Sequence, residues 1–239
     1  MYGLLPWSAF VLRDRPSTTP AGPGLCRKYK VQGGYRTLPS GEPYPIPVKD
    51  CYRALVWVAH NAEKLGIDKD RIAVVGDSAG GALAAAVTLL ARDKNGPSIC
   101  FQMLINPVTD RSMSYWSMRQ FVDSPGWNAN LNRQMWDLYL RSGVFGKPQY
   151  AAPMCAPSLE NLPPAYVETQ EIDCLRDEGN AYADRLAEAG VPVELNEIRG
   201  TFNGYDVLFD KNQLVHLSVT RRCLVLKRAF AKMPLTPRS

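Results

Sequence analysis

A serine lies between two glycines in a segment that could carry nucleophilic catalysis, Gly76-Asp77-Ser78-Ala79-Gly80-Gly81. The β-branched run 71–75 precedes this segment, and the alanine- and leucine-rich run 82–91 follows it. A Gly-x-Ser-x-Gly motif between a strand and a helix forms a nucleophile elbow, a strained turn that raises the serine oxygen above a sheet. The spacing therefore predicts acyl-transfer chemistry with Ser78 as the nucleophile.

The neighbours of Ser78 fit this interpretation. Small residues are needed at Gly76 and Gly80 because the strained turn leaves no room for side chains. The following helix points its N-terminus at the serine, which favours developing negative charge, and the backbone N–H of Ala79 would be one oxyanion donor. A glycine-rich strand–helix turn with an incidental serine is the alternative.

The elements that must position this serine alternate along the chain. Their patterns predict strands at 71–75, 99–105, 164–169 and 192–198 and helices at 48–65, 82–91, 177–189 and 212–232. Such alternation favours an α/β fold, a mostly parallel sheet with helices on both faces. We interpret residues 1–239 as one domain, with a short strand at 28–31 in a proline-rich start. The aromatic-rich segment at about 110–160, with helices at 115–121 and 129–142, would be a cap-like insertion.

The composition suits an ordinary globular protein. Charged residues make up 21% and apolar residues 46% of the 239, which argues against disorder. The net charge of +5 has no Lys/Arg block behind it, and we read the Arg221–Arg222 pair as a solvated helix face, so nucleic acid is not an expected partner. The longest apolar stretch, 82–91, is too short to span a bilayer, and no signal peptide is recognisable.

The cysteines are widely spaced and form no C-x-x-C pair, which argues against a zinc site. They are Cys26, Cys51, Cys100, Cys155, Cys174 and Cys223. A domain of this size does not need disulfides for stability. We therefore expect reduced thiols, a cytoplasmic location and no metal.

Three separate stretches resemble the hormone-sensitive-lipase-like esterases, the bacterial family IV type of α/β hydrolase. These are the elbow itself, the stretch Tyr35-Arg36-Thr37-Leu38-Pro39, and the segment Asp173-x-Leu175-Arg176-Asp177-Glu178-Gly179. The resemblance covers about residues 6–230. It implies an α/β-hydrolase fold, a Ser–Asp–His triad that hydrolyses short-chain carboxylic esters, and no cofactor. Members of the family often pair through the last strand and helix, which leaves a homodimer open.

The resemblance also assigns the catalytic acid. Asp173 matches the acid position of the family and lies just past a predicted strand, where this fold carries it. Asp177 and Glu178 are better explained as residues of a helix start, stabilised by the helix dipole.

The histidine of the implied triad is missing. The family has a histidine before Gly-Phe, after the last strand, but this sequence has Asn203 before Gly204-Tyr205. A carboxamide forms hydrogen bonds but has no useful basicity, so it does not replace imidazole as the general base. The remaining histidines are His60 and His216, and a shifted base at His216 stays open as an alternative.

The oxyanion loop also departs from the family pattern. The family's His-Gly-Gly-Gly loop supplies two backbone N–H donors, but the aligned stretch Pro6–Phe10 contains no glycine. Ser8 and Ala9 would therefore be the upstream donors, while Pro6 has no N–H to offer. The family's N-terminal lid helices and first strands also have no counterpart in this sequence.

Three interpretations follow from these departures. The first is a serine esterase by descent whose activity is weak or lost. The second is a pseudoenzyme that binds a hydrophobic small molecule without turnover, a reuse that plant hormone receptors of this fold exemplify. The third is a shortened gene product.

Overall fold

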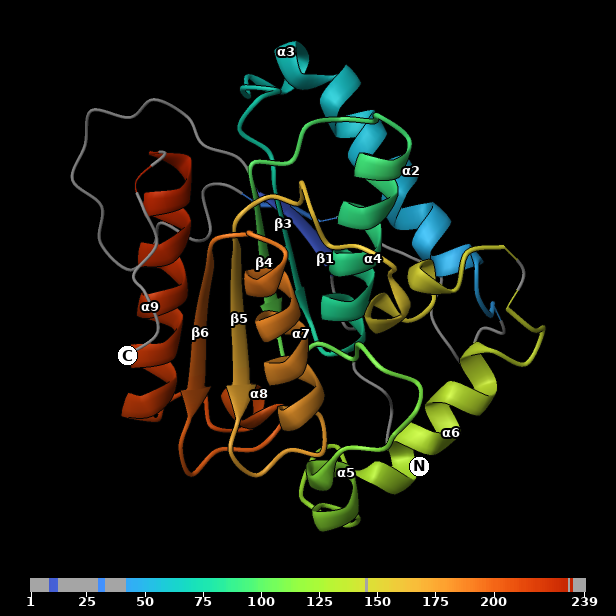
Figure 1. Cartoon of the computed structure of the whole chain (residues 1–239). Coiled ribbons are helices and arrows are strands. Elements are labelled where there is room, and N and C mark those ends of the chain that lie inside the picture. Colours follow the sequence, from blue (N-terminus) through green and yellow to red (C-terminus); the bar gives the residue numbers. More distant parts are fainter. Residues whose placement is uncertain (1–8, 13–29, 33–41, 145, 232, 234–239) are drawn as a thin grey trace.

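A computed structural model describes residues 9–12, 30–32, 42–144, 146–231 and 233. Within this part of the chain, the strands form one sheet in the order β2-β1-β3-β4-β5-β6. They are β1 (Ala9–Leu12), β2 (Lys30–Gln32), β3 (Ala73–Asp77), β4 (Phe101–Ile105), β5 (Ala165–Gln170) and β6 (Val193–Ile198). Strands β3 to β6 pair in parallel, whereas β1 runs antiparallel to both β2 and β3 (Figure 1). The expected α/β-hydrolase architecture with a mostly parallel sheet is confirmed.

The central strands are buried on both faces, as their apolar runs predict. All residues of β4 and β5 are buried. Alternate side chains point to opposite faces of the sheet, so Val74, Leu104 and Val167 join one core cluster. Val75, Met103 and Tyr166 join the cluster on the other face.

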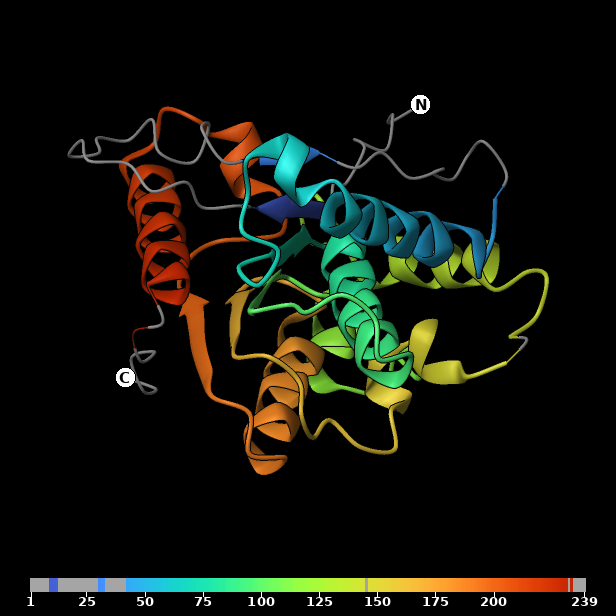
Figure 2. The same cartoon turned by 90° about the horizontal axis from the view of Figure 1, so that it is seen from above.

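The helices cover the two faces unequally. The larger cluster packs α2 (Ile46–His60), α4 (Ala79–Asp93) and α7 (Arg176–Glu188) on one face. The other face is covered by α9 (Gln213–Phe230), whose Val225 and Leu226 join the strands. Figures 1 and 2 show α9 on the opposite side of the sheet from α2, α4 and α7. Because helices pack on both faces of the sheet, the carboxyl ends of β3, β5 and β6 keep their positions relative to one another.

Short helices lie beyond the carboxyl ends of the strands (Figure 1). They are α5 (Trp116–Gln120), α6 (Ala129–Tyr139) and α8 (Tyr205–Leu208). The 3-10 turns η1 (Pro148–Tyr150) and η2 (Pro153–Cys155) pack against α4, and Tyr150 donates a hydrogen bond to Asp93 at the C-terminal end of that helix. Trp127 and Trp136 pack with Cys174 and Leu175 in a separate cluster at this end of the sheet. The aromatic-rich segment therefore contacts the loop that follows β5.

The structure corrects several element boundaries. The helix predicted at 48–65 is divided at Asn61 into α2 and α3 (Ala62–Leu65), because Asn61 leaves helical geometry with a ψ of 15°. Helix α4 begins at Ala79, directly after the elbow serine, and not at 82. Strand β1 and helix α8 are not among the predicted elements, since four residues are too few to show a period. The expectation that the family's lid helices and first strands have no counterpart is not tested by the described residues and stays a prediction.

The cysteines are not all reduced thiols. Cys51, Cys100, Cys155 and Cys174 are free, but Cys223 is disulfide-bonded, so the expectation is wrong for Cys223. Spacing along the chain does not reveal which thiols meet in space, which explains the error. Cys26 lies outside the described residues. No helix in the described ranges has both the length and the apolar character needed to cross a bilayer.

Candidate active site

The turn that carries Ser78 has the geometry of a nucleophile elbow. Ser78 precedes α4 with a φ of 56° and a ψ of −119°, in the left-handed half of backbone space that side chains rarely adopt. A Cβ atom on Gly76 would lie 2.0 Å from the carbonyl oxygen of Gly80, and one on Gly81 would lie 3.0 Å from the Cα of Pro107. The glycines are therefore required by close backbone contacts, as the sequence indicates for Gly76.

The backbone N–H of Ala79 lies directly after Ser78, at the start of α4. Ala79 is the first residue of α4, so its N–H has no acceptor within the helix and is free to face an oxyanion. Ala9 begins β1 and pairs with Gly76, which places its backbone beside the strand that leads into the elbow. Ser8, the other upstream donor expected from the sequence, lies outside the described residues.

The structure places Asp173 in the loop that follows β5, where its side chain is fully buried. Its Oδ1 accepts a hydrogen bond of 3.0 Å from the backbone N–H of Leu175. Burial raises the pKa of Asp173 to about 7, against the opposing effects of hydrogen bonds from Leu175, Asn203 and Cys174. Burial thus favours the protonated form of Asp173, while its hydrogen bonds favour the carboxylate.

Asn203 and Asp173 are brought together. Asn203 lies in the loop between β6 and α8, is buried, and donates a hydrogen bond of 3.1 Å from Nδ2 to Oδ2 of Asp173. Gly126, from the loop before α6, closes over this loop, because a Cβ there would lie 2.3 Å from the carbonyl oxygen of Asn203. The Oδ1 atom of Asn203 is buried and has no partner among the described residues.

This arrangement determines what the site can do chemically. In a Ser–His–Asp triad, the aspartate accepts a hydrogen bond from imidazole Nδ1–H while Nε2 takes the serine proton. The amide N–H of Asn203 reproduces the first interaction with Asp173, but its remaining polar atom is an oxygen with no useful basicity. His60 in α2 and His216 in α9 are both exposed, and the ring of His60 is hydrogen-bonded to the carbonyl oxygen of Val56 in its own helix.

The sequence patterns did not predict a buried cluster of charged side chains formed by Arg222, Glu168 and Asp206. Arg222 of α9, read from the sequence as part of a solvated helix face, has a side chain only 12% exposed and forms ion pairs with Glu168 and Asp206. Glu168 belongs to β5 and Asp206 to α8. The reading was wrong for Arg222 because helical periodicity alone does not show that a buried carboxylate faces the helix. Arg222 thus connects the strand before Asp173 with the helix after Asn203.

Asp77 belongs to the same electrostatic environment. Burial raises its pKa to about 8, and the carboxylates of Asp206, Glu168 and Asp173 add to this effect while Arg222 opposes it. Its Oδ1 atom has no hydrogen-bond partner in the described part of the chain. Burial therefore favours the protonated form of the residue before the nucleophile.

The start of α7 holds the neighbouring loop. Asp177 and Glu178 lie in its first turn, as the sequence predicts. Glu178 is buried and accepts hydrogen bonds from the backbone N–H groups of Thr109, at 2.7 Å, and Asp110, at 3.3 Å. Glu178 therefore fixes the loop after β4 against the loop that carries Asp173. Among the described residues, no group of three or more His, Cys, Asp or Glu side chains gathers in a way that could hold a metal ion.

Comparison with known proteins identifies the family. The profile of the α/β-hydrolase fold matches residues 27–206, most of the chain. The chain belongs to the hormone-sensitive-lipase-like esterases of the α/β-hydrolase fold. It is 42% identical over 183 residues to carboxylesterase NlhH of Mycobacterium tuberculosis (strain ATCC 25618 / H37Rv), covering 73% of this chain and 56% of the relative. It is 38% identical over 181 residues to an arylesterase of Saccharolobus solfataricus, covering 75% and 58%.

Solved structures of this family show the same fold. The structure titled bacterial heroin esterase superimposes with a TM-score of 0.77 at 41% identity, covering 82% of this chain and 63% of that one. A thermostable esterase from Pseudomonas putida ECU1011 gives a TM-score of 0.77 at 36% identity, with the same coverage. The chain spans less than two thirds of the length of each of these relatives.

Proposed function

We propose that this protein is a serine hydrolase of short-chain carboxylic esters whose turnover is weak because the general base is absent. The observation that carries the proposal is the hydrogen bond from Asn203 to Asp173, with Ser78 retained in an elbow geometry. The names carboxylesterase and arylesterase, borne by relatives at 38–42% identity, support esters as the substrate class.

The mechanism follows from these atoms. The Ser78 oxygen would attack the ester carbonyl, and the Ala79 N–H would stabilise the oxyanion. The C–O bond to the alcohol would then break, which releases the alcohol and leaves an acyl-serine that water hydrolyses to the acid. The Ser78 proton then has no basic acceptor, so the acylation step is slow. Loss of the base commonly leaves a rate about 10³–10⁴ above water, and loss of an oxyanion donor costs roughly 10²–10³ more. We therefore expect turnover close to background.

The test compares the hydrolysis of p-nitrophenyl acetate and butyrate by the chain as it stands and by Ser78→Ala, Asn203→His and the double variant. Asn203→His should raise kcat by about 10²-fold or more, and the double variant should lose that gain. Asn130→His, at an exposed position of α6, is the matched control for an added imidazole and should change nothing.

Two outcomes would contradict the proposal. Hydrolysis that survives Ser78→Ala in the Asn203→His background would show that Ser78 is not the nucleophile. No turnover in any folded variant would favour the second interpretation, a protein that binds a small molecule without converting it.

A homodimer and a cytoplasmic location remain predictions. Apolar side chains at the surface of α8 and α9, including Leu208, Phe209 and Leu217, support pairing at this end of the sheet. Light scattering of the chain and of Leu217→Glu would test the dimer, which the added charge should dissociate.

A further inference from the structure

The helix that follows Asn203 is a single turn. Helix α8 begins at Tyr205, and Gly204 alone separates it from Asn203, with a φ of 84° and a ψ of 8°. One helical turn forms too few internal hydrogen bonds to be stable by itself. The position of α8, and with it the position of residue 203, therefore depends on contacts with other elements.

Two side chains of α8 attach it to α9. The hydroxyl of Tyr205 donates a hydrogen bond of 2.7 Å to Oγ of Ser218. Asp206 accepts a hydrogen bond of 2.7 Å from Nη1 of Arg222. Ser218 and Arg222 are four residues apart, so they lie one turn apart on the same face of α9. The two residues that begin α8 are therefore both anchored to one face of α9.

The guanidinium group that binds Asp206 is itself held in place. Nε of Arg222 donates hydrogen bonds to both carboxylate oxygens of Glu168, at 3.1 and 3.2 Å. Glu168 is fully buried in β5 and also accepts a hydrogen bond of 2.7 Å from the hydroxyl of Tyr166. Because the guanidinium is planar and rigid, fixing its Nε edge also fixes the direction of Nη1. Asp206 therefore meets a donor whose position is set by the strand that leads to Asp173.

The loop before α8 is held at its other end by the loop after β5. The backbone N–H of Ile172 donates a hydrogen bond of 2.9 Å to the carbonyl oxygen of Thr201. The backbone N–H of Gly200 donates one of 2.7 Å to the carboxylate of Glu171. Only residues 202–204 lie between these contacts and α8. A short segment that carries Asn203 is therefore fixed at both ends.

We propose that Asp206 is a positioning residue, which places the side chain at position 203 against Asp173 through its contact with Arg222. In the natural chain this placement gives the hydrogen bond of 3.1 Å from Asn203 to Asp173. In an Asn203→His variant it would place the imidazole between Asp173 and Ser78. This second, catalytic part rests on the proposed function, whereas the first part does not.

Ester hydrolysis by the Asn203→His variant tests the catalytic part. Adding Asp206→Ala should lower kcat about 10-fold and leave KM within about 2-fold, since a displaced base slows proton transfer without weakening ester binding. Adding Asp206→Asn instead removes the charge but keeps an oxygen acceptor for Arg222, so most of the lost kcat should return. Equal losses of kcat with alanine and asparagine would overturn the proposal, because the carboxylate would then act through its charge alone.

Hydrogen exchange of the Asn203 side-chain amide, followed by NMR in the natural chain, is a readout that needs no turnover. Its Nδ2 protons should exchange several-fold faster in Asp206→Ala than in wild type or Asp206→Asn, because the hydrogen bond to Asp173 opens more often. If Asn203→His does not hydrolyse esters, the proposed function fails and this exchange still decides the role of Asp206. Unchanged exchange in folded Asp206→Ala would overturn that role.

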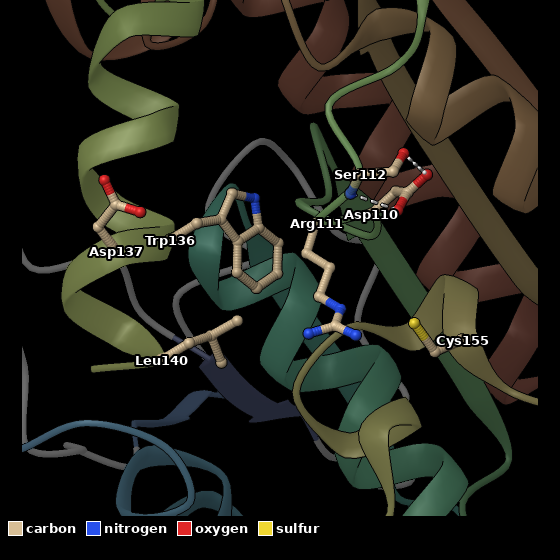
Figure 3. A pocket seen from close by; sticks show the side chains of 7 residues that line it. All are labelled: Asp110, Arg111, Ser112, Trp136, Asp137, Leu140 and Cys155. Carbon is tan, nitrogen blue, oxygen red and sulfur yellow. Dashed lines mark hydrogen bonds between the residues drawn. The ribbon is translucent and has the colours of Figure 1, made fainter. Parts of the chain in front are cut away.

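Two exposed carboxylates are matched controls. Asp210 lies in the turn between α8 and α9. Asp137 lies on α6 and lines a cavity of about 600 Å³ (Figure 3), whose lining in the described part of the chain contains no residue of α8 or α9. Asp210→Ala and Asp137→Ala should change neither kcat in the Asn203→His background nor the amide exchange. An effect of either control as large as that of Asp206→Ala would also overturn the proposal.

Discussion

Asn203 and Asp173 are joined by a single hydrogen bond of 3.1 Å between two buried side chains. The amide thus occupies the donor role that imidazole has in a triad, while its Oδ1 atom is left without a partner in the described part of the structure. The Asp173 side chain is therefore held in place by hydrogen bonds from Asn203 and from the backbone N–H of Leu175.

The first prediction concerns stability and pH at Asp173. Its folded pKa of about 7 lies above the value of about 3.9 for an unfolded aspartate, so the folded state holds the proton more tightly. The associated stability is present below about pH 4 and is lost as pH rises towards 7. Asp173→Asn removes the ionisable group and therefore this pH-dependent loss of stability. The Asn203 amide can rotate so that its Oδ1 atom accepts a hydrogen bond from the new amide at position 173. The variant should therefore gain about 2–4 kcal/mol relative to wild type between pH 4 and pH 8.

Urea denaturation of wild type and Asp173→Asn at pH 4 and at pH 8 measures this difference in the free energy of unfolding. Asp123→Asn, at an exposed loop position, is the matched control and should show no comparable change. The prediction is wrong if Asp173→Asn follows the wild-type pH dependence.

The second prediction concerns backbone strain at Ser78. With a φ of 56°, any residue with a Cβ is strained there, whereas glycine is not. Ser78→Gly should be more stable than Ser78→Ala by about 1 kcal/mol, despite the greater flexibility of glycine in the unfolded chain. Chemical denaturation of both variants tests this, and the reverse order would show that the turn is unstrained.

The third prediction concerns the contact beneath the elbow. A Cβ on Gly76 would lie 2.0 Å from the backbone oxygen of Gly80, which cannot move without displacing α4. Gly76→Ala should therefore cost more than about 3 kcal/mol or prevent folding. Gly179→Ala is the milder comparison, because its Cβ would meet the side chains of Thr169, at 2.8 Å, and Pro107, at 3.5 Å, and no backbone atom at short range, and because alanine favours the helix. Similar stability of the two variants would contradict the contact.

The fourth prediction concerns Arg222. Arg222→Met leaves the buried carboxylate of Glu168 without its cation and should cost about 3–5 kcal/mol. Arg221→Met is the neighbouring control, since Arg221 is 41% exposed in its pair with Glu194 and should cost less than about 1 kcal/mol. Thermal unfolding of the two variants measures the contrast. Equal losses would mean that Arg222 does not support the loops of the site.

Local patterns in the sequence are sufficient to predict much of the structure of this protein. Alternating strand and helix patterns predict the sheet, because hydrophobic periodicity is set by short-range geometry. The motif around Ser78 predicts the elbow, because its glycines are required by contacts within a few residues. The positions of Asp173 and Asn203 follow from a family resemblance that needs no coordinates.

Only the tertiary structure decided how distant residues meet. The hydrogen bond between Asn203 and Asp173 and the burial of Arg222 against Glu168 both involve chain segments far apart in sequence. Such relations depend on which elements pack together, and on the burial that results, so no local pattern encodes them. The sequence alone determined which chemical groups this protein carries and which it lacks, and packing determined what those groups face.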